Sequence, residues 1–365
     1  MNEKRNQFRG VMLGLAVGDA MGHTVDSRSL GEICRDYGPN GLLGYDLVNG
    51  YADVTSYTQL AAFCANGLLF GLTRGQTQGR RDALLRYLTI AIREWSRSQT
   101  FSYPERNFCW LSGVPEMKRK FCMDTRMLDA LSREKLGSPD APQYKSNQPG
   151  SLTCVIPIAL MGKELGLAEW ERDLLSAEVV ALTHGQADAF LAGSVLQRLL
   201  CFLLDDRNTP LGEAVQLATD SIKSQFAESY TQNTRLFPLL EQALQLAITP
   251  DVGPMEAMET LGCRTAAEVL AGAVYAVATC GRDFDAAMIA SVNHSGRSAA
   301  VGAITGCLLG AILGEDALPE FYLESLEPTA TLIELADDMA AGFSEMVEKS
   351  LFDMDWDRKY RSAGQ

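Results

Sequence analysis

The sequence has few of the residues that build common metal and redox sites. Its 365 residues include only three histidines, which excludes a histidine-rich metal centre. The nine cysteines are an odd number, and no two of them form a CxxC pair. Zinc knuckles and disulfide frameworks depend on such pairs or on an even set of cysteines. We therefore expect a reduced, cytoplasmic chain without either feature.

Positive charge and long apolar runs are also scarce. There are 32 Lys and Arg residues against 46 Asp and Glu, a formal net charge of -14. Binding a nucleic-acid backbone needs a clustered positive surface, so we expect no nucleic-acid partner. The longest apolar stretch, residues 301–314, has 14 residues, and a helix needs roughly 20 to cross a bilayer. The N-terminus, MNEKRNQFRG, is too polar for a secretory signal. We expect no membrane partner.

Apolar residues at helical spacing are abundant. They make up 47% of the chain and recur every three or four residues, the period of an amphipathic helix. Alternating strand patterns are rare. We therefore predict an all-α protein, a single compact multi-helix bundle over residues 1–350 with a polar C-terminal tail at 351–365. The segments with the helical pattern are 60–72, 81–97, 177–204, 238–247, 266–278 and 332–349. The expected loops are 26–57, 99–116 and 135–151.

Two runs of glycine at four-residue spacing stand out. They are Gly10, Gly14, Gly18 and Gly22, and Gly302, Gly306, Gly310 and Gly314. A glycine inside a helix costs about 1 kcal/mol relative to alanine, so a compensating interaction is expected. Four-residue spacing places each run on one helix face, where another backbone can approach closely. We interpret the runs as close packing of two core helices, which would bring Asp19 and the segment 293–300 to one site.

Five segments, in order, resemble the ADP-ribosylglycohydrolase (crystallin J1-related) family. RGVMLGLAVGDAMG at 9–22 is similar to the family's opening helix and its GDAxG signature. YADVTSYTQLAAFCANGLL at 51–69 stands in the place of a TDDTQ motif, and VNHSGRSAAVGAITGCLLGAILG at 292–314 in that of the closing GDxDT motif. GSLTCVIPIAL at 150–160 and ALTHGQADAFLAGSVL at 181–196 match the segments between them. The resemblance covers nearly the whole chain and implies a compact all-α bundle with a central cleft.

The same resemblance implies a chemistry. Active members of the family are described as dinuclear Mg²⁺ hydrolases that remove ADP-ribose from modified side chains and related adducts. Mg²⁺ takes oxygen ligands, and a pair of such ions would orient the ribose and activate a water molecule. The family places its ligands on the aspartates of the two motifs and on an acid shortly after GDAxG. Asp26 falls at the position of that early acid.

This sequence departs from the family at the other ligand positions. Ser56 and Tyr57 replace the two aspartates of TDDTQ, while Arg297 and Ala299 replace those of GDxDT. A guanidinium group directed into a dinuclear site would repel the cations that the site has to hold. We therefore expect no metal and no cofactor, since four principal ligands are lost.

Several roles remain open for the acids and for Arg297. The guanidinium would form an ion pair with Asp19 or Asp26 and so replace the metal's charge, or it would bind a phosphate or carboxylate of a ligand. Asp53 would serve as a substitute ligand only if the loop shifted in register. His23 and His294, together with Asp19 or Asp26, are a weaker candidate for a transition-metal site.

Other residues are expected in the cleft because they belong to the matched motifs. His184 would contact a ligand or, alternatively, satisfy a helix junction. Tyr57 would fill the vacated volume or stack on a base. The complete set of expected cleft residues is Asp53, Thr55, Ser56, Tyr57, His184, Gly296, Arg297 and Ser298.

Three functions follow from these observations. The first is a pseudoenzyme that keeps the fold and binds an ADP-ribose-like small molecule or a protein partner. The second is a divergent hydrolase of ADP-ribosyl or related ribosyl linkages, in which Asp19, Asp26 or Asp53 is the general base and Arg297 stabilises charge. The third is a module whose acidic surface recruits a basic protein.

Overall fold

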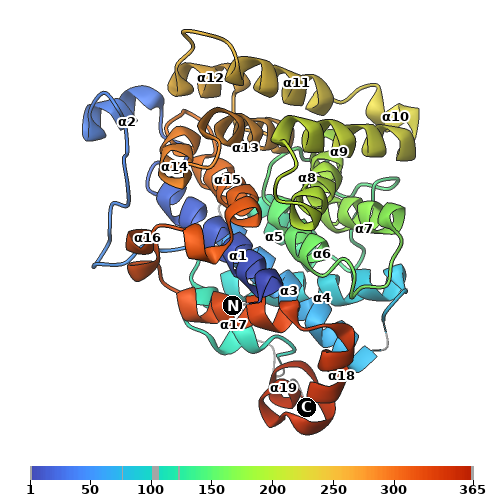
Figure 1. Cartoon of the computed structure of the whole chain (residues 1–365). Helices are drawn as coiled ribbons and strands as arrows, with labels where there is room; N and C mark the ends of the chain where they lie inside the picture. Colours follow the sequence, from blue (N-terminus) through green and yellow to red (C-terminus); the bar gives the residue numbers. More distant parts are fainter. Residues whose placement is uncertain (1, 76, 101–106, 122–123, 363–365) are drawn as a thin grey trace.

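The computed structural model describes residues 2–75, 77–100, 107–121 and 124–362, and within them it contains 19 α-helices and no β-strand (Figure 1). The predicted all-α class is therefore confirmed. The first helices are α1 (Glu3–His23), α2 (Leu30–Tyr37), α3 (Ser56–Gly75), α4 (Arg81–Gln99), α5 (Thr125–Ser132), α6 (Ile156–Leu160), α7 (Glu169–Ala181), α8 (Ala187–Asp205), α9 (Leu211–Gln225) and α10 (Glu228–Thr231). The others are α11 (Leu236–Ala247), α12 (Pro254–Leu261), α13 (Ala266–Cys280), α14 (Phe284–Val292), α15 (Ser298–Leu313), α16 (Glu320–Glu324), α17 (Thr329–Ala340), α18 (Phe343–Phe352) and α19 (Met354–Tyr360). Short 3₁₀ turns lie at Trp110–Gly113, Glu116–Lys118, Leu152–Val155 and Glu315–Ala317.

The two glycine runs lie against each other at the centre of the molecule. Helices α1 and α15 run side by side there and form the most extensive helix pair of the fold (Figure 1). A Cβ atom built on Gly14 would lie 2.2 Å from the carbonyl oxygen of Gly306, and one built on Gly18 would lie 1.9 Å from that of Gly302. Such distances leave no room for a side chain, so only glycine permits this backbone contact. The expected close packing of the two helices is confirmed.

Gly314 has a different role from the other glycines of its run. It follows the last residue of α15 with φ 78°, a conformation that side chains other than glycine rarely adopt. Its backbone N–H donates to the carbonyl oxygen of Gly310. This glycine therefore ends the helix, while the others of the run form the packed face.

The segment 177–204, which has the helical pattern throughout, is two helices in the structure. Helix α7 ends at Ala181 and α8 begins at Ala187. Between them the N–H groups of Gly185 and Gln186 donate to the carbonyl oxygens of Tyr144 and Ser146. The backbone of this junction is thus bonded to a distant loop, which interrupts the helical hydrogen-bond ladder although the apolar spacing continues.

One more helix prediction and one loop prediction need correction. The pattern at 332–349 is divided between α17 and α18, with Ala341 and Gly342 between them. The expected loop 26–57 contains α2, which begins with a reciprocal capping box between Ser29 and Glu32. Residues 101–106 of the expected loop 99–116 lie outside the described residues.

The C-terminal segment 351–365, expected to be a polar tail, contains the packed helix α19. Trp356 and Tyr360 are 1% and 0% exposed, and the Trp356 ring nitrogen donates to the Thr73 hydroxyl at 3.2 Å. The ammonium group of Lys359 and the hydroxyl of Tyr360 both bond to the carboxylate of Asp338, at 2.5 and 2.7 Å. The buried rings of Trp356 and Tyr360 attach this segment to the core, whereas Leu351, Phe352 and Met354 are exposed. Residues 363–365 lie outside the described residues.

One described helix, α8, is long and apolar enough to cross a bilayer by composition alone. Its most apolar 18-residue window has a mean hydropathy of 1.5 and is 72% buried inside the fold. It packs against α6, α7, α9 and α13. The apolar character of α8 is that of a core helix.

The glycine contact between α1 and α15 predicts an unusual response to alanine. Gly306→Ala is expected to lower the free energy of unfolding by about 3 kcal/mol or more, although alanine favours helix formation by about 1 kcal/mol. The added methyl group would lie 1.9 Å from the Gly14 carbonyl oxygen, so the helices must separate. The control is Gly212→Ala in α9, because a Cβ atom built on Gly212 has no neighbouring atom within 4 Å. Chemical denaturation that shows equal effects for both variants would contradict the backbone contact.

Candidate functional site

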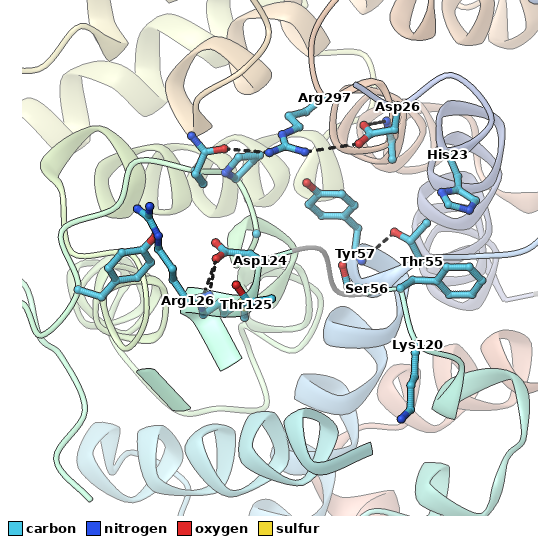
Figure 2. Close-up of a pocket in the computed structure, with 17 residues that line it drawn as sticks. His23, Asp26, Thr55, Ser56, Tyr57, Lys120, Asp124, Thr125, Arg126 and Arg297 are labelled. Carbon is cyan, nitrogen blue, oxygen red and sulfur yellow. Dashed lines mark hydrogen bonds and ion pairs between the residues drawn. The ribbon is translucent and has the colours of Figure 1, made fainter. Parts of the chain in front are cut away.

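A cavity of about 470 Å³, named here the Arg297 cavity, opens where four helix ends meet. It lies at the C-terminal end of α1 and at the N-terminal ends of α3, α5 and α15, and residues of the loop 144–150 also line it. Figure 2 shows Asp26, Tyr57, Asp124 and Arg297 around it. The lining residues are His23, Asp26, Thr55, Ser56, Tyr57, Lys120, Phe121, Asp124, Thr125, Arg126, Met127, Tyr144, Gln148, Pro149, Gly150, Arg297 and Ala299. Of the expected cleft residues, it therefore contains Thr55, Ser56, Tyr57 and Arg297.

Arg297 forms the predicted ion pair with Asp26 at this cavity. Its Nη1 atom lies 3.7 Å from the Asp26 carboxylate and donates to the Ser27 hydroxyl at 2.9 Å. Its Nη2 atom is 3.5 Å from the side-chain oxygen of Gln148, in the loop 144–150. The guanidinium side chain remains 36% exposed, so it is held between two walls of the cavity and still accessible to a ligand.

Backbone contacts fix the relative position of Asp26 and Arg297. The Asp26 carboxylate accepts a hydrogen bond from the N–H of Ala299, in the first turn of α15, at 3.1 Å. The N–H of Ser27 donates to the Gly296 carbonyl oxygen at 3.1 Å. Because the glycine faces bring the end of α1 to the start of α15, these short segments meet without long side chains between them.

Asp19, expected to be catalytic, has a structural position. It is 0% exposed and does not line the Arg297 cavity. Its carboxylate accepts four hydrogen bonds, from the N–H and hydroxyl groups of Thr55 and Thr58, at 2.6 to 3.0 Å. Burial raises the pKa of Asp19, and these four hydrogen bonds oppose the rise. Asp19 thus caps the N-terminus of α3 from α1, and its oxygens are already occupied.

Asp53, Gly296 and Ser298 also lie away from the cavity lining. The Asp53 carboxylate forms an ion pair with Arg119, which also pairs with Glu327 at 2.5 Å. A Cβ atom on Gly296 would lie 2.4 Å from the Cys263 carbonyl oxygen. Ser298 is 0% exposed. These residues support the turn before α15 and the loop before α3.

His184 is buried behind the wall of the cavity. Its Nδ1 atom is 2.8 Å from the hydroxyls of Ser151 and Thr183, and its Nε2 atom is 3.4 Å from the carboxylate of Asp124. Burial opposes ionisation of Asp124, but the contact with His184 and the N–H groups of Met127 and Arg126 outweigh it and lower the pKa of this carboxyl. His184 therefore occupies the α7–α8 junction and supports a cavity residue, without lining the cavity itself.

The other two histidines are separated by the fold. His23 lines the cavity and packs edge-on against Phe121, with ring centroids 5.1 Å apart. His294 is 0% exposed, accepts from the Gly296 N–H and contacts the Ser291 carbonyl oxygen through Nε2 at 3.0 Å. Burial lowers the pKa of His294 to about 4, so this ring is neutral and structural at neutral pH.

The carboxylates of the cavity do not fit a pair of Mg²⁺ ions. Only Asp26 and Asp124 line it among the described residues, and Asp26 is engaged by Arg297 and by the Ala299 N–H. Over the same described part of the chain, no three His, Cys, Asp or Glu side chains form a group that would hold a metal ion. A dinuclear site needs several oxygen ligands to offset the charge of two dications, and this donor set is too small.

Some cavity residues were not predicted from the sequence. They come from the segment 120–126 and from the loop 144–150, and they include Lys120, Asp124, Arg126 and Gln148. The sequence contained only a weak indication of the first segment, because the run Lys118-Arg119-Lys120 is typical of an ordinary solvated surface. Residues 122 and 123 lie outside the described part of the chain.

The Asp19 cap predicts a loss of stability when its charge is removed. In Asp19→Asn an NH₂ donor replaces one carboxylate oxygen, which is the acceptor either of the Thr55 hydroxyl or of the Thr58 hydroxyl and both N–H groups. The hydrogen bonds that remain also lose the carboxylate charge, so the free energy of unfolding should fall by about 2 to 3 kcal/mol. Asp205→Asn is the matched control, because that side chain is 66% exposed. Thermal and urea unfolding measure both; an Asp19→Asn protein as stable as the control would show that the cap is unimportant.

Comparisons with known proteins agree with this architecture. A solved structure described as "ADP-ribosylglycohydrolase-related protein complex" aligns with a TM-score of 0.58 and 23% sequence identity, covering 93% of this chain and 99% of its own. At this identity, the likeness shows a common fold. None of the curated proteins compared with the chain matches it. The profile of one protein family, described as ADP-ribosylglycohydrolase, matches residues 1–348. This chain, whose α1–α15 core carries the segments matched above, belongs to the ADP-ribosylglycohydrolase family.

Proposed function

We propose that this chain is a pseudoenzyme of its family, which binds an ADP-ribose-like ligand in the Arg297 cavity and lacks the dinuclear Mg²⁺ site. The observation that carries the proposal is the position of Arg297. Its guanidinium group lies 3.7 Å from Asp26, in a motif where the family resemblance places a metal-binding aspartate. A fixed positive charge there neutralises Asp26 and repels divalent cations.

The charges of the cavity favour an anionic ligand. Lys120, Arg126 and Arg297 line it together with only two carboxylates, Asp26 and Asp124. The described lining is therefore net positive in a chain whose formal charge is -14. The N-terminal ends of α3, α5 and α15 also face this region, and helix N-termini carry partial positive charge. A diphosphate fits this combination, because guanidinium groups donate paired hydrogen bonds to phosphate oxygens.

The cavity also has surfaces suited to a base and a ribose. The side chains of His23, Tyr57, Phe121 and Tyr144 line it, and aromatic faces stack on nucleobases. The volume of about 470 Å³ lies within the range of small-molecule sites. Hydroxyl, amide and carboxylate groups of Ser56, Gln148 and Asp124 lie nearby and would bond to ribose hydroxyls.

A divergent hydrolase is the second candidate function, and one observation favours it. Asp124 lines the cavity with a lowered pKa, so it would be ionised at neutral pH and able to accept a proton weakly. Asp26 is the only one of the three previously considered bases that lines the same cavity, since Asp19 and Asp53 are engaged elsewhere. Hydrolysis would then rely on these acids and on charge stabilisation by Arg297.

We also propose that the protein works in a reducing compartment, the cytoplasm. All eight cysteines among the described residues are unpaired, and several are completely buried. Burial raises the pKa of Cys64, Cys263 and Cys307, which keeps these thiols protonated. They serve as small apolar core residues.

Ligand binding is tested by calorimetry with ADP-ribose. The intact protein should bind it, and Arg126→Gln should weaken binding about tenfold or more because a charged hydrogen bond to phosphate is lost. Arg133→Gln, on the same helical segment, is the control: its side chain is 49% exposed and pairs with Asp129 away from the cavity. Equal affinities of the two variants, or no binding by the unmodified protein, would reject the Arg297 cavity as the site.

Metal binding separates the pseudoenzyme from a metal-dependent hydrolase. Titration with Mg²⁺ or Mn²⁺ should give no micromolar binding, and release of ADP-ribose from modified arginine or serine peptides should remain at background. The combined substitution Ser56→Asp, Tyr57→Asp, Arg297→Asp and Ala299→Asp should create micromolar affinity, since it restores four carboxylates. Metal-independent release by the unmodified protein would instead favour the divergent hydrolase, and micromolar metal binding by it would exclude the pseudoenzyme.

A further inference from the structure

A second cavity, of about 300 Å³, lies between the end of α3 and the beginning of α4 and shares no lining residue with the Arg297 cavity. We name it the Arg86 cavity. Its lining combines two kinds of side chain, arginines and aromatic residues: Arg74, Arg80, Arg86, Phe70, Tyr87 and Phe108. This combination occurs on an acidic protein, so it is not a product of overall composition.

No carboxylate is among the described residues that line the Arg86 cavity. Of the three arginines, Arg80 forms an ion pair, with Asp82 at 4.0 Å, and both of these side chains are largely exposed. Arg74 and Arg86 form no ion pair with any residue that the structure describes; Arg74 lies over the Phe70 ring, 5.5 Å from its centroid. The negative end of α3 and the positive end of α4 meet here and largely offset each other. The three guanidinium groups therefore set the charge of the cavity.

The aromatic wall is built by close packing of α4 on α3. A third series of glycines at four-residue spacing, Gly67, Gly71 and Gly75, lies on α3. Cβ atoms on Gly71 and Gly75 would lie 2.8 and 2.7 Å from the ring and hydroxyl of Tyr87. The missing side chains thus let the Tyr87 ring lie flat against α3 and beside Phe70, with centroids 5.8 Å apart.

Thr77 adds a buried polar group at the same place. It lines the cavity, is 1% exposed, and its hydroxyl has no hydrogen-bond partner among the residues that the structure describes. A buried hydroxyl without a partner costs free energy that a bound ligand or water molecule would recover. Arg74 and Arg86 form no ion pair among the described residues, so several hydrogen-bond donors without a charged partner there line this small volume.

We propose that the Arg86 cavity binds a phosphate monoester that carries an aromatic group. Guanidinium groups match the oxygens of a phosphate dianion in pairs, and three of them suit its charge better than that of a single carboxylate. The ring of the ligand packs against Phe70, Tyr87 and Phe108 in the edge-on or offset geometry of aromatic pairs. An aryl phosphate and a nucleoside monophosphate share this chemistry. The site is separate from the proposed ADP-ribose site and is independent of it.

Calorimetry on the full chain with phenyl phosphate tests the inference. Binding with a submillimolar Kd is expected, with inorganic phosphate and phenol each at least tenfold weaker. Arg86→Gln should weaken phenyl phosphate about tenfold or more. Arg97→Gln removes an exposed arginine from the same helix outside this cavity and should leave the affinity unchanged. Tyr87→Leu should weaken phenyl phosphate but leave the weak binding of inorganic phosphate unaltered.

Comparison of O-phosphotyrosine with adenosine monophosphate then identifies the source of the ligand, and tight binding of either supports the proposal. Absence of phenyl phosphate binding overturns it. So does an equal loss in Arg86→Gln and Arg97→Gln, which would mean diffuse charge attraction. Loss of phenyl phosphate binding in Arg126→Gln with retention in Arg86→Gln would place the ligand in the Arg297 cavity and also overturn it, while leaving the ADP-ribose proposal standing.

Discussion

The backbone contact between α1 and α15 is the constraint on which the rest of the structure depends. Glycines on each helix face the carbonyl oxygens of the other, at distances that a Cβ atom could not occupy. Interior glycines destabilise isolated helices, so the two helices gain their stability from packing against each other. Because the contact is between backbones, it fixes the register of the pair more strictly than flexible side chains would.

Two sets of contacts from this helix pair set the geometry of the site. The end of α1 meets the start of α15, which places Asp26 beside the Ala299 N–H and the Arg297 guanidinium. Behind the cavity lining, Asp19 of α1 accepts hydrogen bonds from Thr55 and Thr58 at the start of α3. The segment that lines the cavity at Ser56 and Tyr57 is therefore anchored by a fully buried carboxylate. Internal hydrogen bonds and one ion pair hold the walls of the cavity in place.

Charge is distributed unevenly over this acidic chain, and two of its cavities are rich in arginine. Both concentrate arginine: Arg126 and Arg297 in one, and Arg74, Arg80 and Arg86 in the other. The two differ in construction. The Arg297 cavity is formed by helix ends and loops from distant parts of the sequence, whereas the Arg86 cavity is local to α3 and α4. The first can be reshaped by changes in several elements, while the second depends on the close approach of Tyr87 to Gly71 and Gly75.

Much of the fold could be predicted, because its signals are local or periodic. Apolar spacing indicated the all-α class, and the glycine runs indicated the α1–α15 contact. The prediction of one helix over 177–204 was wrong because apolar spacing indicates only which face of a segment is buried. It does not indicate that the N–H groups of Gly185 and Gln186 donate to a distant loop. At the site, the pairing of Arg297 with Asp26 was among the alternatives considered, while the burial of Asp19 and the contribution of Asp124, Arg126 and Gln148 were not foreseen.

The sequence by itself determined the helical class and the paired glycine faces. These properties depend on residue type and spacing along one chain segment. Only the tertiary structure decided that Asp26 pairs with Arg297 and that Asp19 caps α3. It also decided that α19 packs on the core through Trp356 and Tyr360. Those outcomes depend on distances between segments far apart in the sequence, which no local pattern encodes.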